Sequence, residues 1–201
     1  MPGTDHLFAK SLIDIIKNDL GSKTIKKIEN RLFEKFGLSL TQAVEEFNTF
    51  DLVLREFFGK GADAIERKIF EKIFVIKSKQ SIDPWYALSD AYVNSVILET
   101  YGDLDKRKIL KSVSDTPKII NDILKDCGLP RTSGYRKINN LIDNGLLLKT
   151  GHIEVDNKKI SKYMCIFSNL KINIEKSKLT VDVQFTKSEQ LRSPILQSIQ
   201  K

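Results

Sequence analysis

The stretch from Thr116 to Leu147 constrains the fold of this chain more than any other. It has a helical segment up to Cys127, a turn at Gly128, a basic helical segment after Pro130, and then Gly145 before an apolar strand start. Two helices joined by a short turn that contains glycine are typical of a helix-turn-helix. In such motifs the second helix can enter the major groove of DNA, so this stretch predicts a helix that contacts DNA.

Positive charge is concentrated at and after the second of these helices. From Arg131 onward the chain has 13 Lys and Arg against 6 Asp and Glu, a net charge of +7, whereas the first 130 residues have 20 of each. A chain that is simply rich in lysine would also have basic faces, which would be solvated and bind no polyanion. Charge that is confined to one part of a chain favours a polyanionic partner for that part.

The basic helix is expected to have an apolar side and a polar side. Ile138, Leu141 and Ile142 share one side at 100° per residue, with Tyr135 at its margin. The opposite side has polar residues at i, i+3, i+4 and i+7, namely Ser133, Arg136, Lys137 and Asn140. This pattern fits either an ordinary solvated face or a surface that binds DNA.

Each polar side chain has an expected role if the helix binds DNA. Arginine can pair with guanine and asparagine with adenine, so Arg136 and Asn140 are expected to contact bases. Thr132, Ser133 and Lys137 are expected to hold phosphates. Tyr135 fits either the domain core or a DNA contact.

From Leu146 the hydrophobic period changes to two, which predicts strands. One hairpin is expected around the turn Asp156–Lys159, with its second strand from Ile160 to Phe167. Lys158 and Lys159 would lie at its tip, where they either contact a DNA backbone or minor groove or serve solubility. A second hairpin is predicted for 170–174 and 179–185, and the tail from Thr186 is expected to be a short helix or disordered.

The first part of the chain is expected to be helical from about residue 5 to 76. Apolar residues repeat at helical spacing over four segments, about 8–20, 25–36, 39–59 and 62–74, with glycines between them. A polar linker follows at 77–83, and Asp83-Pro84 predicts the start of a helix that continues to Tyr101. The expected domains are a helical bundle at 1–76, a linker and connecting helix at 77–101, a DNA-binding domain with its hairpin at 102–185, and a tail at 186–201. The predicted class is α+β, mostly α.

Four segments follow one another in a recognisable order: Tyr101–Leu110, Gly128–Leu141, Asn144–Leu147 and Lys162-Tyr163. Through these segments, residues 94 to 167 resemble the winged helix-turn-helix domain of ArsR-type and related archaeal transcriptional regulators. The resemblance implies a regulator that binds duplex DNA. Pro130 replaces the usual capping Ser or Thr, and Gly134 replaces a branched apolar residue. Gly134 is therefore expected to be either a local defect or a point of close approach to the DNA backbone.

Neither a metal site nor an enzyme is predicted. Cys127 lacks the second thiol that metal-sensing members of the resembled family have on this helix, and Cys165, His6 and His152 have no ligand spacing with it. The glycines of Phe58–Ala62 lack the full pattern of a phosphate-binding loop. No signal peptide or membrane span is visible, so we expect a cytoplasmic protein with reduced thiols and no cofactor.

Two-fold DNA-binding proteins contact two half-sites, so a homodimer is expected, formed through the first region or through the helix at 85–101. Residues 54–66 weakly resemble small helical output domains of archaeal signalling chains. That region would serve dimerisation, sensing of a ligand or redox signal, or docking of a signalling protein. The sequence thus predicts a transcriptional regulator; the alternatives are a protein-interaction module and a non-specific nucleic-acid or chromatin binder.

Overall fold

The computed structural model describes residues 3–77, 83–176 and 178–199 and has the mixed α+β class that the sequence predicts, with antiparallel sheets. The helical elements are α1 (Thr4–Phe36), α2 (Leu40–Glu45), α3 (Phe47–Phe58), the 3₁₀ turn η1 (Gly59–Gly61), α4 (Ala62–Glu71), α5 (Ala91–Gly102), α6 (Leu104–Ser112), α7 (Ile120–Cys127), α8 (Arg131–Asp143), α9 (Lys187–Arg192) and α10 (Pro194–Ile199). The strands are β1 (Phe74–Ile76), β2 (Tyr86–Leu88), β3 (Lys118–Ile119), β4 (Leu147–Val155), β5 (Lys158–Cys165), β6 (Phe167–Glu175) and β7 (Lys178–Phe185).

The first region is helical as predicted, but two details differ. The predicted helix stop at Gly21 is confirmed as a break inside α1: Gly21 has a non-helical φ of 73° and ψ of 156°, so α1 consists of two helices joined at a kink. The single helix expected at 39–59 is two helices, since Glu46 leaves the helical region at φ −111° and ψ 67°. Phe74 was expected in the last helix and instead begins β1, where it pairs with Leu88.

The predicted helix start at Asp83-Pro84 is wrong. The residues that follow form β2, which pairs with β1 on one side and with β7 on the other. The helix begins later, at Ala91, where the Asp90 carboxylate accepts the Val93 N–H at 2.8 Å and so caps it. Pairing with a strand nearly a hundred residues away outweighs the local capping signal. Most of the predicted linker at 77–83 lies outside the described residues.

The second predicted hairpin is confirmed, and it joins the strands from the first half of the chain. β6 and β7 pair from Phe167↔Phe185 to Glu175↔Lys178. The resulting sheet has the order β1-β2-β7-β6. The tail from Thr186 is helical as α9 and α10, and the Thr186 hydroxyl caps α9.

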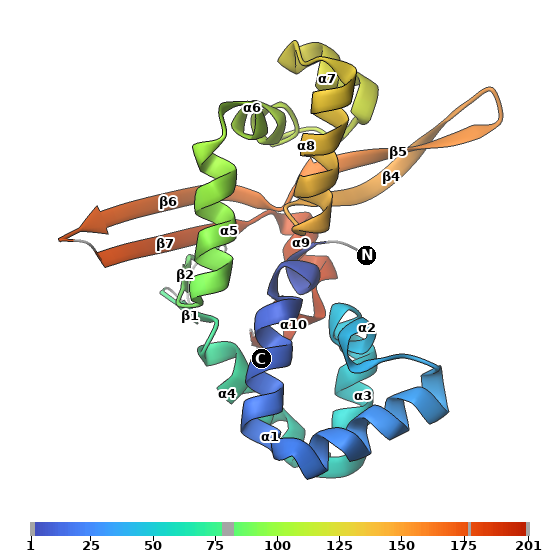
Figure 1. Ribbon diagram of the computed structural model, residues 1–201, viewed down its shortest axis with the longest axis vertical. Coiled ribbons are helices and arrows are strands. Elements are labelled where there is room, and N and C mark those ends of the chain that lie inside the picture. Colours follow the sequence, from blue (N-terminus) through green and yellow to red (C-terminus); the bar gives the residue numbers. More distant parts are fainter. Residues whose placement is uncertain (1–2, 78–82, 177, 200–201) are drawn as a thin grey trace.

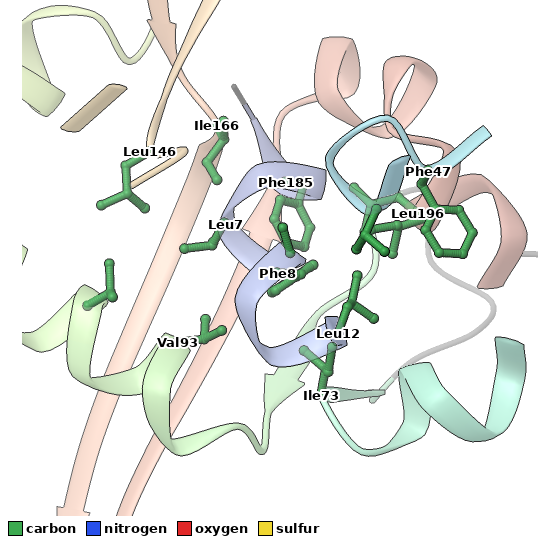
Figure 2. Packing of buried hydrophobic residues seen from close by; sticks show 14 of the residues in the cluster. Leu7, Phe8, Leu12, Phe47, Ile73, Val93, Leu146, Ile166, Phe185 and Leu196 are labelled. Carbon is green, nitrogen blue, oxygen red and sulfur yellow. The ribbon is translucent and has the colours of Figure 1, made fainter. Parts of the chain in front are cut away.

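The core surrounds α1, whose buried side chains pack against this sheet and against other helices. Figure 2 shows Phe8 beside Phe185, with Leu7 directed toward Leu146 and Ile166. The Phe8 ring lies 5.3 Å from the ring of Phe74 and 6.3 Å from that of Phe185, measured between centroids. Aromatic contacts in these geometries add to the stabilisation from burial.

The remaining elements form a unit at one end of the molecule. Helices α6, α7 and α8 lie with a second sheet of order β3-β5-β4. In Figure 1 the ribbon of β4 and β5 extends to the right of α8, and the ribbon of β6 and β7 extends to the left, behind α5. Within the described residues, no helix has the length and apolar character needed to cross a membrane.

Candidate nucleic-acid interface

The turn between α7 and α8 fixes how the two helices meet. Gly128 adopts the left-handed conformation at φ 64°, which glycine tolerates without strain. The N–H of Leu129 donates to the Leu124 carbonyl at 3.0 Å, and the N–H of Gly128 donates to the Lys125 carbonyl at 3.2 Å. These two bonds form a Schellman motif, so the end of α7 has its carbonyls satisfied and the chain reverses sharply into α8.

Gly134 is neither a defect nor a point of approach to DNA. It is buried and faces α7: a Cβ at this position would lie 2.2 Å from Leu124 Cδ2 and 3.4 Å from Leu129 Cβ. The Leu124 side chain therefore occupies the volume that a larger residue 134 would need. Both sequence-based interpretations of Gly134 are wrong, because the residue permits close packing of the two helices.

The inward position of Gly134 sets which side of α8 faces solvent. Gly134, Ile138 and Leu141 are buried, whereas the exposed residues recur along the opposite side. The exposed side chains are Arg131, Thr132, Tyr135, Arg136, Asn139 and Asp143. Of the predicted polar face, Ser133, Lys137 and Asn140 are only partly exposed. The exposed face is thus rotated by about one residue, roughly 100°, from the predicted one.

Lys137 is held by the start of α6. Its ammonium group pairs with the carboxylate of Asp103, and with that of Asp105 at 3.3 Å. The hydrogen bond that Lys137 donates to Asp103, more than any other contact, raises the pKa of Lys137, and the same bond lowers the pKa of Asp103. Asp103 also caps α6 by accepting the N–H groups of Asp105 and Lys106. Lys137 therefore links α8 to α6, and its side chain is only 19% exposed.

The other predicted residues of α8 have different surroundings. Arg136 is exposed, and its guanidinium forms no ion pair with any described residue. The Tyr135 hydroxyl donates to Asn121 Oδ1 on α7 at 3.1 Å, although 38% of the residue is exposed. Asn140 Oδ1 accepts a bond from Asn144 at 3.3 Å, and the Ser133 hydroxyl donates to the Pro130 carbonyl at the same distance.

The ribbon of β4 and β5 ends in a tight turn. Its turn consists of Asp156 and Asn157, both at positive φ, which is the geometry of a two-residue hairpin turn. Lys158 and Lys159 are exposed as predicted, but they begin β5 rather than lying in the turn. Across the ribbon Lys158 faces Val155, and Lys159 faces Glu154.

The far end of α8 is clamped by the beginning of α1. Gly145 ends α8 at φ 73°, and a Cβ there would lie 2.6 Å from the Gly3 carbonyl oxygen and 2.7 Å from the Leu7 nitrogen. His6 Nε2 donates to the Asp143 carbonyl at 2.7 Å. The backbones of α1 and of the α8–β4 turn are therefore in direct contact, which leaves room only for glycine.

The two thiols are separate and differ in burial. Cys127 lies in a groove between α6 and α7, and burial raises its pKa. Cys165 is buried, which raises its pKa to about 11. Among the residues that the structure describes, no group of three or more His, Cys, Asp or Glu is arranged to hold a metal ion.

Sequence reasoning missed Arg131 and Asn139 as exposed residues of α8. The predicted apolar side of the helix contains only Ile138, Leu141 and Ile142, because glycine has no side chain that marks it as apolar in such a pattern. Counting Gly134 as an inward position would have shifted this side toward the observed one. No family model, curated protein or solved structure matches this chain.

Proposed function

We propose that the chain is a DNA-binding transcriptional regulator in which α6 to β5 act as a winged helix-turn-helix on duplex DNA. The observation that carries this proposal is the exposed face of α8. It presents a hydroxyl, a guanidinium and an amide from Thr132, Arg136 and Asn139, with a second exposed guanidinium, that of Arg131, at the helix N-terminus, and has no carboxylate before Asp143 at its end. Guanidinium and amide groups on a short exposed helix are suited to base edges.

The roles of individual residues follow from exposure. Arg136 and Asn139 would contact bases, because both are exposed on the same side of α8. Thr132 would contact phosphate, as would Lys158 and Lys159 from the ribbon of β4 and β5. Asn140 and Lys137 would act through the packing of α8, since each is bonded to a neighbouring side chain.

Binding of labelled duplexes, measured by fluorescence anisotropy after selection from a random-sequence pool, tests the proposal. Arg136→Ala should weaken specific binding by about 1–3 kcal/mol and relax sequence preference, whereas Lys158→Ala should weaken all sequences similarly and lower the salt slope by about 1. Lys60→Ala, on the distant η1 turn, also removes one positive charge, and it should change neither the affinity for DNA nor the salt slope. Asn139→Ala should reduce specific binding more than Asn140→Ala does.

Two outcomes would refute the proposal in different ways. No salt-dependent affinity for any duplex would favour a protein-interaction module. A steep salt slope with no preferred sequence would favour non-specific nucleic-acid binding.

A further inference from the structure

Strand β6 has an open edge. In the sheet order β1-β2-β7-β6, no strand of the described residues pairs with its second side. Successive residues of an antiparallel strand direct their N–H and C=O groups to alternate sides, so both groups of every second residue of β6 point toward this open edge. Unpaired peptide groups on an edge strand are a template for another strand.

The same strand has apolar side chains on one face. Leu170, Ile172 and Ile174 alternate along it, and the residues opposite the first two on β7 are buried in the core. Toward the tip the face loses this cover, and Ile174 is 67% exposed. In Figure 1 the ribbon of β6 and β7 continues beyond α5 into solvent.

The edge lacks the usual protection. Lysine side chains on edge strands commonly block pairing with other chains. Lys171 is instead drawn across the sheet, where its Nζ lies 4.1 Å from the centroid of the Trp85 ring. β6 also contains no proline, and its one register irregularity lies at its base, between Phe167 and Asn169.

We propose that β6 pairs in antiparallel orientation with β6 of a second copy of this chain, about a two-fold axis at Asn173. This register places Lys171 opposite Glu175 and Ile172 opposite Ile174, and the symmetry repeats each pair. On pairing, the Lys171 ammonium would leave the Trp85 ring to meet Glu175 of the second copy. Residues two apart direct their peptide groups to the same edge, so Ile172 and Ile174 can also exchange backbone hydrogen bonds. Opposite charges and apolar residues that face each other across strands are stabilising.

Neighbouring registers are less complementary. A two-fold axis at Ile172 places Lys171 opposite Asn173 and Glu175 opposite Asn169, so neither charge is matched. An axis at Ile174 places Ile172 opposite Lys176 and Glu175 opposite Asn173. The register at Asn173 is the one of these three that matches both charges.

The paired ribbons would overlap only at their tips, from Leu170 to Lys176, with the two bodies at opposite ends. This overlap is shorter than a standard protein interface, so the dimer is expected to dissociate reversibly on dilution. It involves no residue of α8 or of the β4–β5 ribbon. The dimer is therefore independent of the proposed DNA binding, and either could fail without the other.

Sedimentation velocity of the full chain over a series of concentrations, without DNA, tests the proposal. The wild-type chain should show a reversible monomer–dimer equilibrium. Glu175→Lys places two lysines opposite each other, and Lys171→Glu places two glutamates opposite each other. Each change should raise the dissociation constant by about tenfold or more, because like charges directly opposite are destabilising. The double variant Lys171→Glu with Glu175→Lys should restore dimerisation.

Ile174→Lys places a charge on the apolar face at an exposed position and should yield a monomer. Leu191→Lys, at a residue on α9 that is 77% exposed, is the matched control and should leave the dimer intact. Circular dichroism melts would show that each variant is folded. A wild-type monomer at all concentrations, single charge changes without effect, or a double variant that stays monomeric would each overturn the proposal.

Discussion

Replacing Gly134 with alanine tests whether close packing, rather than DNA contact, explains this glycine. Alanine favours a helix interior over glycine by about 1 kcal/mol, so the change would be stabilising at an open position. Here the new methyl group would lie 2.2 Å from Leu124 Cδ2, and the buried Leu124 would have to move. Overpacking of this kind costs about 1–3 kcal/mol, so we expect a net destabilisation of about 1 kcal/mol.

The same substitution should have the opposite sign once Leu124 is shortened. Leu124→Ala alone should cost about 2–5 kcal/mol, because it leaves a cavity between α7 and α8. Adding Gly134→Ala to that variant should recover about 1 kcal/mol, because the nearest remaining neighbour of the new methyl is Leu129 Cβ at 3.4 Å. The interaction free energy of the two substitutions in this double-mutant cycle should thus be about 2 kcal/mol, within the range seen for residues in contact.

Urea unfolding followed by far-ultraviolet circular dichroism measures all four proteins of this cycle. Gly102→Ala is the control: it lies at the end of α5 with no atom within 4 Å of the new Cβ, and it should stabilise the chain by about 0.4–1 kcal/mol. If Gly134→Ala stabilised the wild-type background as much as the Leu124→Ala background, the packing explanation would be wrong. Unchanged stability in both backgrounds would likewise contradict the packing explanation.

Two further predictions concern buried contacts in other parts of the chain. Gly145→Ala combines a φ of 73° with a Cβ only 2.6 Å from the Gly3 carbonyl oxygen, so it should lower the free energy of unfolding by about 3 kcal/mol or more, measured in urea. A loss below about 1 kcal/mol would contradict the direct backbone contact between α1 and the α8–β4 turn. Burial, and then a hydrogen bond that the protonated Glu66 shares with the Asp51 carboxylate, raise the pKa of Glu66 from 4.5 to about 8. The folded state therefore keeps a proton that the unfolded state loses above pH 4.5. The unfolding free energy should then fall as pH rises from about 5 to 8, by at most about 1.4 kcal/mol per pH unit. Glu66→Gln should flatten this dependence in urea unfolding at several pH values, and an unchanged slope would exclude Glu66 as its cause.

Local sequence signals predicted the elements whose structure is determined locally. The turn at Gly128, the basic helix up to Asp143, and both hairpins are present, because glycine conformations and alternating side chains specify them within a few residues. β1 and β2 were missed. Each has three residues, and their pairing with each other and with β7 is specified by partners distant in sequence. A strand that short carries almost no periodic signal.

In the candidate interface, too, the local pattern predicts the exposure of side chains but not their contacts with residues far away in the chain. The sequence correctly indicated that Arg136, Lys158 and Lys159 are exposed. It assigned Lys137 to phosphate because nothing near it in the chain is acidic, whereas its partner Asp103 lies 34 residues earlier. Side chains that meet across helices cannot be recognised from the pattern of one helix.

The contact between α1 and α8 bears on how the two halves of the chain are related. The boundaries expected at residues 76 and 102 treat the first helices and the DNA-binding region as separate, and they remain a prediction about independent folding. In the structure Gly3 and Leu7 touch Gly145 directly, and Phe8 packs against Phe185. The sheet of β1, β2, β7 and β6 also joins strands from both sides of residue 102. The C-terminal end of α8 is therefore in direct contact with the first helix, in addition to the packing of α8 on α6 and α7. Cutting the chain at either boundary would expose core side chains that Figure 2 shows in contact.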